Sequence, residues 1–134
     1  MRLFVELFVT DLARARQFYR DALGFEIMRD EPTYVALRRG EARLNLCPFA
    51  GLRPDHYLAV KGARLGSRVE FCLEVADLEA AYQQALAAGA IIQTPIKARP
   101  WRRTDFRLTD PDGAYWRVTT PEMAPQDQQE SEGM

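Results

Sequence analysis

VELFVTDLARARQFYRDALGF, residues 5–25, has a counterpart later in the chain, EFCLEVADLEAAYQQALAAGA, residues 70–90. Asp11 and Leu12 of the first stretch align with Asp77 and Leu78, which stand 66 positions later. Self-similarity of this kind indicates that the same supersecondary unit occurs twice. We therefore expect a fold built from two similar halves.

Each copy has the pattern of a strand that leads into a helix. Apolar side chains alternate before the aspartate, as Val5, Leu7 and Val9 do in the first copy. Apolar residues then recur at helical spacing over about 12–22 and again over about 78–88. The predicted capping residues are Asp11 and Asp77 at the helix starts and Gly24 and Gly89 after the helix ends.

Three further strands are expected after each helix. They cover about 25–30, 33–39 and 42–48 in the first half, and about 90–98, 104–110 and 114–120 in the second. A Pro-Asp-Gly turn at 111–113 joins the last two, because proline presets one backbone angle and glycine tolerates a positive φ. The chain is thus predicted to be an α+β protein of two βαβββ modules. The helices should cover the strand face that carries Val5, Leu7 and Val9.

Composition places the chain among ordinary globular proteins. It has 134 residues, 47% of them hydrophobic and 28% charged, with a formal net charge of −1. No basic excess points to nucleic acid, and no apolar run approaches the length of about 18 residues that indicates a membrane span. Because the N-terminus also lacks the pattern of a secretory signal, a cytoplasmic location is expected, with neither nucleic acid nor membrane as a partner.

The chain is predicted to be one domain, residues 1–121, with modules at about 3–47 and 68–121 and a connector at 48–67. Residues 122–134 are polar and acidic and are expected to form a disordered tail.

Cysteine and histidine are scarce. Cys47 and Cys72 have no CxxC spacing and are expected to be buried or half-buried thiols, while His56 is expected to be a solvated loop residue. These three residues cannot form a zinc site of the usual kind.

The chain resembles the vicinal oxygen chelate superfamily, which includes glyoxalase I, extradiol dioxygenases, and bleomycin-resistance and thiol-transferase proteins. FVTDLARARQFYRDALGF (8–25) resembles the first strand and helix of that superfamily, and EVADLEAAYQQALAAGA (74–90) resembles those of the second module. FRLTDPDGAYWRVTTP (106–121) resembles its last hairpin. ARPWRRTDF (98–106) resembles the tryptophan loop of the bleomycin-resistance-like branch. The resemblance covers about residues 3–121.

The resemblance implies a cupped mixed sheet around a cavity, with the helices on its outer face and often with a second subunit closing it. In metal-using members, four positions on the inner face bind a divalent ion. Here these positions hold Phe4, Asn45, Glu70 and Arg117. Only Glu70 is a good ligand, and the Arg117 cation would repel a metal. We therefore predict neither a metal nor another cofactor. A shift in strand register would instead place Glu6 and Glu74 in ligand positions.

Glu70 and Arg117 are expected to form a partly buried ion pair where metal-using members hold their ion. Such a pair points either to recognition of a polar ligand or to a structural salt bridge in a filled core. Trp101 is interpreted as either a packed plug or a stacking platform. The predicted ligand-binding residues are Phe4, Glu6, Phe8, Asn45, Glu70, Cys72, Glu74, Trp101, Tyr115 and Arg117.

Three functions are compatible with these features. The favoured one is a metal-independent, bleomycin-resistance-like protein that sequesters an aromatic or cationic small molecule in the groove of a homodimer. The second is a metal-dependent lyase, isomerase, dioxygenase or thiol transferase, which requires three or four metal ligands. The third is a metal-free enzyme with a glutamate as general base. No catalytic residue is predicted.

Overall fold

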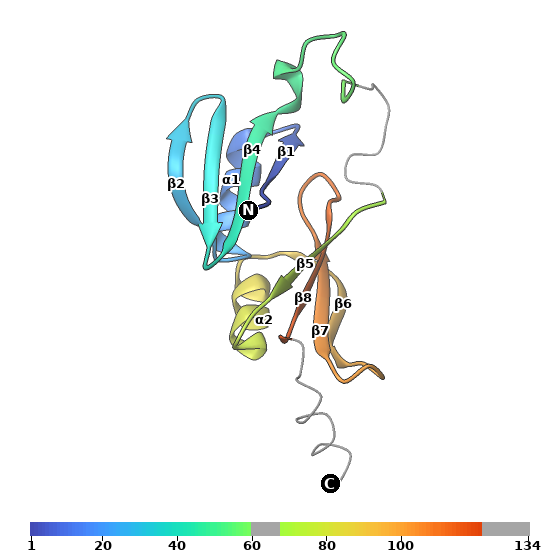
Figure 1. The fold of residues 1–134 in the computed structure, drawn as a ribbon. Coiled ribbons are helices and arrows are strands. Elements are labelled where there is room, and N and C mark those ends of the chain that lie inside the picture. Colours follow the sequence, from blue (N-terminus) through green and yellow to red (C-terminus); the bar gives the residue numbers. More distant parts are fainter. Residues whose placement is uncertain (60–67, 122–134) are drawn as a thin grey trace, which may run out of the picture.

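The computed structural model of the chain describes residues 1–59 and 68–121 (Figure 1). Residues 60–67 of the expected connector and the expected tail at 122–134 lie outside the described residues. The first module comprises β1 (Val5–Val9), α1 (Leu12–Asp21), β2 (Glu26–Glu31), β3 (Tyr34–Arg39) and β4 (Ala42–Pro48). A short 3₁₀ helix, η1 (Phe49–Gly51), follows it. The second module comprises β5 (Glu70–Glu74), α2 (Leu78–Ala87), β6 (Ile91–Ala98), β7 (Thr104–Thr109) and β8 (Tyr115–Thr119).

The two modules have the same topology, which confirms the predicted α+β fold of two βαβββ units. Their strands form two four-stranded sheets, in the orders β1-β4-β3-β2 and β5-β8-β7-β6. In each sheet the first strand pairs in parallel with the last, and the remaining neighbours pair antiparallel. The strand that precedes each helix therefore lies at one edge of its sheet.

The helix boundaries agree with the predicted caps. The carboxylates of Asp11 and Asp77 each accept a hydrogen bond of 3.0 Å from a backbone amide three residues later. Each bond satisfies one of the free amides at the start of a helix. Gly24 and Gly89 have φ values of +70° and +74°, the left-handed conformation that ends a helix.

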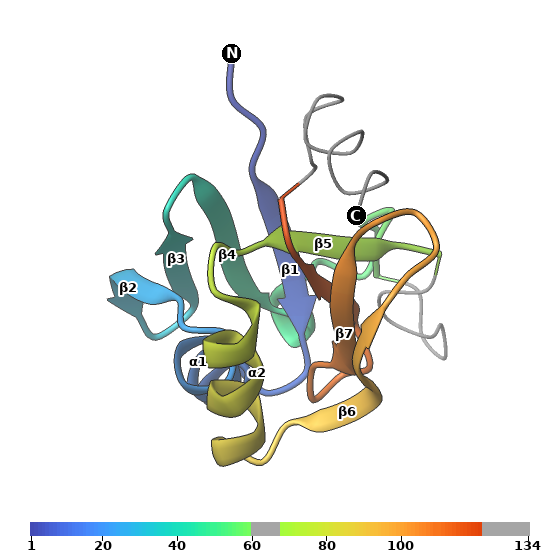
Figure 2. The ribbon, with the colours of Figure 1, turned by 90° about the horizontal axis from the view of Figure 1, so that it is seen from below.

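One hydrophobic core serves both modules. Its buried side chains come from α1, from the first sheet, from α2 and from the second sheet. Trp116 and Val118 lie in this core, as the alternation along the last strand predicts. The two helices lie next to each other on this side of the molecule (Figures 1 and 2). The core therefore holds the modules together through their helix-covered faces.

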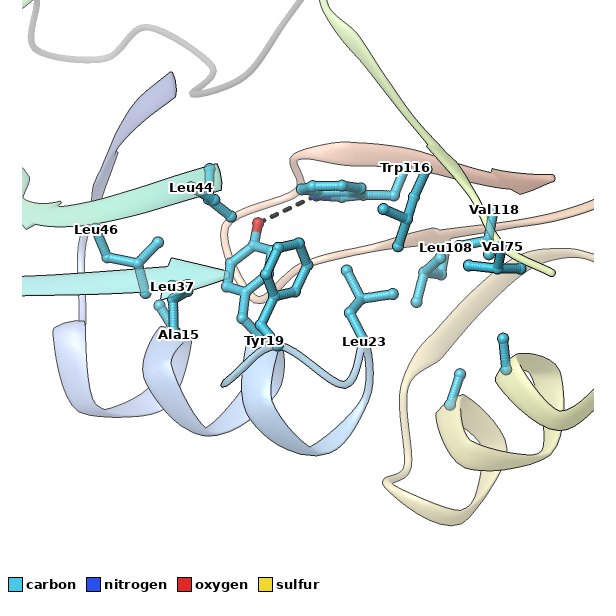
Figure 3. Close-up of a cluster of buried hydrophobic side chains, with 14 of the residues drawn as sticks. Ala15, Tyr19, Leu23, Leu37, Leu44, Leu46, Val75, Leu108, Trp116 and Val118 are labelled. Atoms are coloured by element: carbon cyan, nitrogen blue, oxygen red, sulfur yellow. Dashed lines mark hydrogen bonds between the residues drawn. The ribbon is translucent and has the colours of Figure 1, made fainter. Parts of the chain in front are cut away.

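A polar network in the core connects α1 with the last hairpin (Figure 3). The Tyr19 hydroxyl donates a 2.7 Å hydrogen bond to Asp110, and the indole N–H of Trp116 donates one of 3.1 Å to the Tyr19 oxygen. Burial, together with the nearby charge of Asp110, raises the pKa of Tyr19 well above its usual value. At the surface, the Thr10 backbone amide donates to the Asp112 carboxylate at 3.1 Å. These contacts join one end of α1 and β1 to the 110–113 turn.

The helices in residues 1–59 and 68–121 are too short and too polar to cross a membrane. This finding agrees with the absence of a long apolar run in the sequence.

Candidate functional site

The sheet of the second module carries a dense group of charged side chains on the face opposite its helix. Side chains on this face alternate with the buried core residues of β5, β7 and β8. We call this surface the second-sheet face. Its residues are Glu70, Cys72, Glu74, Asp105, Arg107, Tyr115 and Arg117.

Arg117 is paired as the sequence predicts. One of its terminal nitrogens lies 3.3 Å from a carboxylate oxygen of Glu70, and their side chains are 23% and 35% exposed. The same nitrogen donates to the sulfur of Cys72 at 3.1 Å. The hydrogen bond to Cys72 raises the pKa of Arg117, so the guanidinium stays charged. The predicted partly buried ion pair is confirmed, and the two residues lie on adjacent strands of one sheet.

Sequence reasoning missed the cation next to Arg117. Arg107 on β7 lies directly opposite Arg117 across the hairpin. It donates to the Tyr115 hydroxyl at 3.4 Å, and its Nε lies 3.5 Å from a carboxylate oxygen of Asp105. The signal for this pairing was present, because residues 107 and 117 are equally far from the centre of the predicted Pro-Asp-Gly turn.

Asp105 was also missed. It is fully buried, and one of its oxygens accepts a 3.0 Å hydrogen bond from Nε of Arg99. A terminal nitrogen of Arg99 lies 2.9 Å from the same oxygen. A buried carboxylate requires such a partner because desolvation of an unpaired charge is costly. Arg99 is therefore the main counter-ion of Asp105.

The sheet of the first module places other predicted residues on its face opposite α1. Glu6 lies beside Asn45 in the β1–β4 pairing and accepts a 3.2 Å hydrogen bond from the Tyr34 hydroxyl. The guanidinium carbon of Arg29 lies 5.2 Å from the centre of the Tyr34 ring, within the range of a cation–π interaction. Tyr34 and Arg29 belong to a strand pair that the sequence reading did not connect with the site.

The ring of Phe8 lies near the connector. Its centroid is 6.3 Å from that of the exposed His56, whose Nδ1 accepts a hydrogen bond from the Leu58 amide. The exposed position of His56 agrees with the prediction of a solvated loop residue. Its Nδ1 is engaged in a local turn.

A crevice between the modules brings Phe4 and Cys72 together. They line a pocket of about 200 Å³ that also contains Phe71 and Trp116. A neighbouring pocket of about 580 Å³ contains Cys72 and Glu74. The β3–β4 turn contributes to both pockets, so they adjoin along the edge strand β5.

Two expectations about individual side chains require correction. Cys72 is exposed, not buried or half-buried, because it lies on the open face of an edge strand. Strand alternation places Thr119 on the same face as Arg117 and so predicts a hydroxyl that faces the ligand. In the structure this side chain is fully buried and donates to the backbone carbonyl of Thr104 at 3.2 Å. Trp101 is half-exposed in the β6–β7 loop and is not among the residues that line the crevice. The choice between plug and platform stays open for this residue.

The side chains do not fit the divalent metal that the resemblance implies. Phe4 provides no donor atom, Arg117 carries a positive charge, and Glu70 already pairs with Arg117. Among the residues that the structure describes, no three histidine, cysteine, aspartate or glutamate side chains are grouped so as to hold a metal ion. Glu6 and Glu74, which a shift in register would supply as ligands, do not belong to such a group among the described residues either.

Comparison with known structures gives close matches over nearly the whole chain. A protein of unknown function from Agrobacterium tumefaciens is 28% identical, with a TM-score of 0.76 over 91% of this chain and 95% of the other. A glyoxalase-related enzyme from Fulvimarina pelagi is 19% identical, with a TM-score of 0.75 and coverage of 90% and 88%. A glyoxalase/bleomycin resistance protein/dioxygenase from Nocardioides is 18% identical, with a TM-score of 0.72 and coverage of 93% and 87%.

Comparison with curated proteins gives no match. The family described as the Glyoxalase/Bleomycin resistance protein/Dioxygenase superfamily matches residues 3–118. This match covers both modules, and the glyoxalase-type structures from Fulvimarina pelagi and Nocardioides share their arrangement. The chain therefore belongs to the Glyoxalase/Bleomycin resistance protein/Dioxygenase superfamily.

Proposed function

We propose that this protein binds and sequesters a small aromatic molecule without the help of a metal ion. One observation carries the proposal. At the position where metal-using relatives are expected to place a ligand, Arg117 forms an ion pair with Glu70, the only good ligand of the four. A guanidinium in this place offers hydrogen-bond donors to a ligand. A metal ion would instead require side chains that donate an electron pair, which a guanidinium cannot do.

The surroundings support an organic ligand. Phe4 is half-exposed at the crevice between the modules, and Tyr115 and Tyr34 lie on the two open sheet faces. Aromatic side chains provide flat apolar surfaces, and stacking on them contributes about 0.5–1.5 kcal/mol beyond burial. Polar groups between such surfaces would fix the orientation of the ligand.

A second copy of the chain completes the proposed site. Phe4, Met28 and Val69 are large apolar side chains that remain exposed. The sheet faces opposite the helices are only partly covered, because Glu6, Cys72 and Glu74 remain exposed on them while Asp105 and Thr119 are buried. A homodimer would cover these surfaces and form a groove, and closed two-fold dimers are the commonest assembly of soluble proteins. Sedimentation equilibrium of the full chain tests this part of the proposal.

Metal analysis separates this function from metal-dependent catalysis. We expect the purified protein to contain less than one equivalent of zinc, nickel, manganese or iron, and its melting temperature to stay constant when these ions are added or removed by a chelator. A bound ion that stabilises the protein and is lost in the Glu70→Gln variant would refute metal-independent binding.

Ligand binding is tested by fluorescence with planar aromatic compounds, including bleomycin-type antibiotics. We expect a compound that binds to raise the melting temperature and to change tryptophan emission. If Trp101 is the platform, the Trp101→Ala variant loses most of the affinity. Tyr57→Ala is the matched control, because Tyr57 is 90% exposed in the connector. A broad panel without any effect on fluorescence or melting temperature would count against the proposal.

A further inference from the structure

We propose that the ligand carries a carboxylate or a similar planar oxyanion, which binds between the guanidinium groups of Arg107 and Arg117. This inference rests on the proposed function and adds the charge of the ligand to it. The sequence predicts an aromatic or cationic ligand, and Glu6 and Glu74 are the residues that would suit a cation. The pairing of Arg107 with Arg117 on the second-sheet face favours a ligand of the opposite sign at this point.

The strand register places two positive charges side by side. Arg107 and Arg117 are directly opposite each other on the antiparallel strands β7 and β8. Their side chains are only 21% and 23% exposed, so water screens their repulsion less than at an open surface. Like charges in this position destabilise a sheet. An anion between them would convert the repulsion into attraction.

Apart from the 3.1 Å hydrogen bond from Arg117 to the Cys72 sulfur, the contacts that these two arginines make within the chain are long. Arg117 reaches Glu70 at 3.3 Å, and Arg107 reaches Tyr115 at 3.4 Å and Asp105 at 3.5 Å. By comparison, Arg16 reaches Asp30 at 2.7 Å on the surface of the same protein. Charge-assisted hydrogen bonds are normally about 2.7–2.9 Å long. Both guanidinium groups therefore retain unused bonding capacity.

The Nε atoms of the two arginines also have unused hydrogen-bonding capacity. Nε of Arg107 and Nε of Arg117 are buried and have no hydrogen-bond partner among the described residues. A buried donor without an acceptor costs about 1–3 kcal/mol. Because the contacts from the terminal nitrogens to oxygen atoms are long, each guanidinium can turn toward a ligand and present its Nε–H together with a terminal N–H. In Arg117 this turn gives up the hydrogen bond to Cys72.

The charge of the group is unbalanced. Arg99, Arg107 and Arg117 form ion-pair contacts with Asp105 and Glu70, which leaves one positive charge in excess within this network. Glu74 lies on the same face but forms no ion pair with these arginines among the described residues. Asp105 is committed to Arg99 through the two shortest contacts of the group. A singly charged carboxylate would neutralise the excess. Its two oxygens can accept hydrogen bonds from the two guanidinium groups, one oxygen for each, and each planar guanidinium can offer its Nε–H and a terminal N–H on the same side.

Three probes with one ring system and different charges test the inference: 1-naphthoate, 1-naphthamide and 1-naphthylmethylamine. Calorimetric titration of the full chain should show tightest binding for the naphthoate, and this binding should weaken as salt is added. Arg107→Gln and Arg117→Gln should each weaken naphthoate binding about tenfold or more, while they leave binding of the amide unchanged.

Two control variants distinguish the loss of a specific contact from misfolding and from a general effect of net charge. Arg117→Lys keeps the charge but loses the fork, and should retain part of the naphthoate affinity. Arg20→Gln removes a charge from α1, where Arg20 pairs with Asp21, and should leave all affinities unchanged. Circular dichroism and melting temperature confirm that each variant folds.

The outcomes separate the inference from the function on which it rests. Equal affinity for the three probes, or preference for the amine, overturns the anion site and leaves metal-independent aromatic binding in place. Preference for naphthoate that both glutamine variants retain also overturns it, because the anion then binds elsewhere. Failure of all three probes to bind counts against both proposals.

Discussion

Replacing Tyr19 by phenylalanine removes a single hydroxyl from the contact between the two modules. In the native structure that hydroxyl donates to Asp110 at 2.7 Å and accepts from the indole of Trp116 at 3.1 Å. All three side chains are buried. The aromatic ring stays, so its edge contacts with Phe25 and Trp116 are expected to persist.

The expected loss of stability follows from the two buried groups that lose their hydrogen bond to Tyr19. The indole N–H of Trp116 loses its acceptor, and one oxygen of Asp110 loses its donor. The other oxygen of Asp110 keeps the backbone amides of Asp112 and Ala114, at 2.9 and 2.8 Å. Each buried group left without a hydrogen-bond partner costs about 1–3 kcal/mol, so the free energy of unfolding should fall by about 2–4 kcal/mol. For a chain of this size, the melting temperature should fall by about 10 °C.

Urea denaturation followed by circular dichroism measures this free energy. Tyr57→Phe is the matched control, since Tyr57 is 90% exposed, and it should change stability by less than about 0.5 kcal/mol. A Tyr19→Phe protein within about 0.5 kcal/mol of the wild type would refute the reasoning. Such a result would mean that the hydroxyl network contributes nothing to the union of the modules.

Three further predictions concern pH, turn geometry and helix capping. Burial raises the pKa of Asp110, so the native state keeps a proton that the unfolded chain loses as pH rises. The unfolding free energy should therefore fall with rising pH above about pH 4, and urea titrations should show that Asp110→Asn removes this slope. Gly113→Ala should cost about 1–2 kcal/mol in urea unfolding from strain alone, because φ is +88° and an added Cβ meets nothing within 4 Å. Gly51→Ala, equally open, should cost much less, and equal costs would contradict the strain argument. Asp77→Ala should destabilise the protein by about 1 kcal/mol in thermal unfolding, because the Ala80 amide loses its cap. An unchanged melting temperature would show that water replaces the cap at no cost.

The elements of the fold were predictable because their signals are local. Alternation of apolar residues, a capping aspartate and a glycine with positive φ act within a few residues of one another. The repeat strengthened these signals, because the same pattern occurred twice with the same offset. Both helices end one residue earlier than expected, at Asp21 and Ala87, and Ala22 and Ala88 serve as C-caps.

The site was predictable only in part. The ion pair of Glu70 and Arg117 followed from the resemblance and strand parity, and the structure confirms it. Arg107 and Asp105 were missed because each strand was read separately, without the pairing across the hairpin. Their positions depend on register, which links residues about ten positions apart. The ligand-binding roles of all the predicted residues stay predictions.

The sequence by itself determined the modules, their caps and the composition of the two strand faces, since short-range geometry controls all three. Only the tertiary structure decided that α1 joins the last hairpin through Tyr19, Asp110 and Trp116. The tertiary structure alone also decided that Cys72 is exposed and that two arginines stand opposite each other. The reason is that burial and charge balance depend on which distant segments meet. Contacts between distant segments depend on how the whole core packs, and no short stretch of the chain encodes that packing.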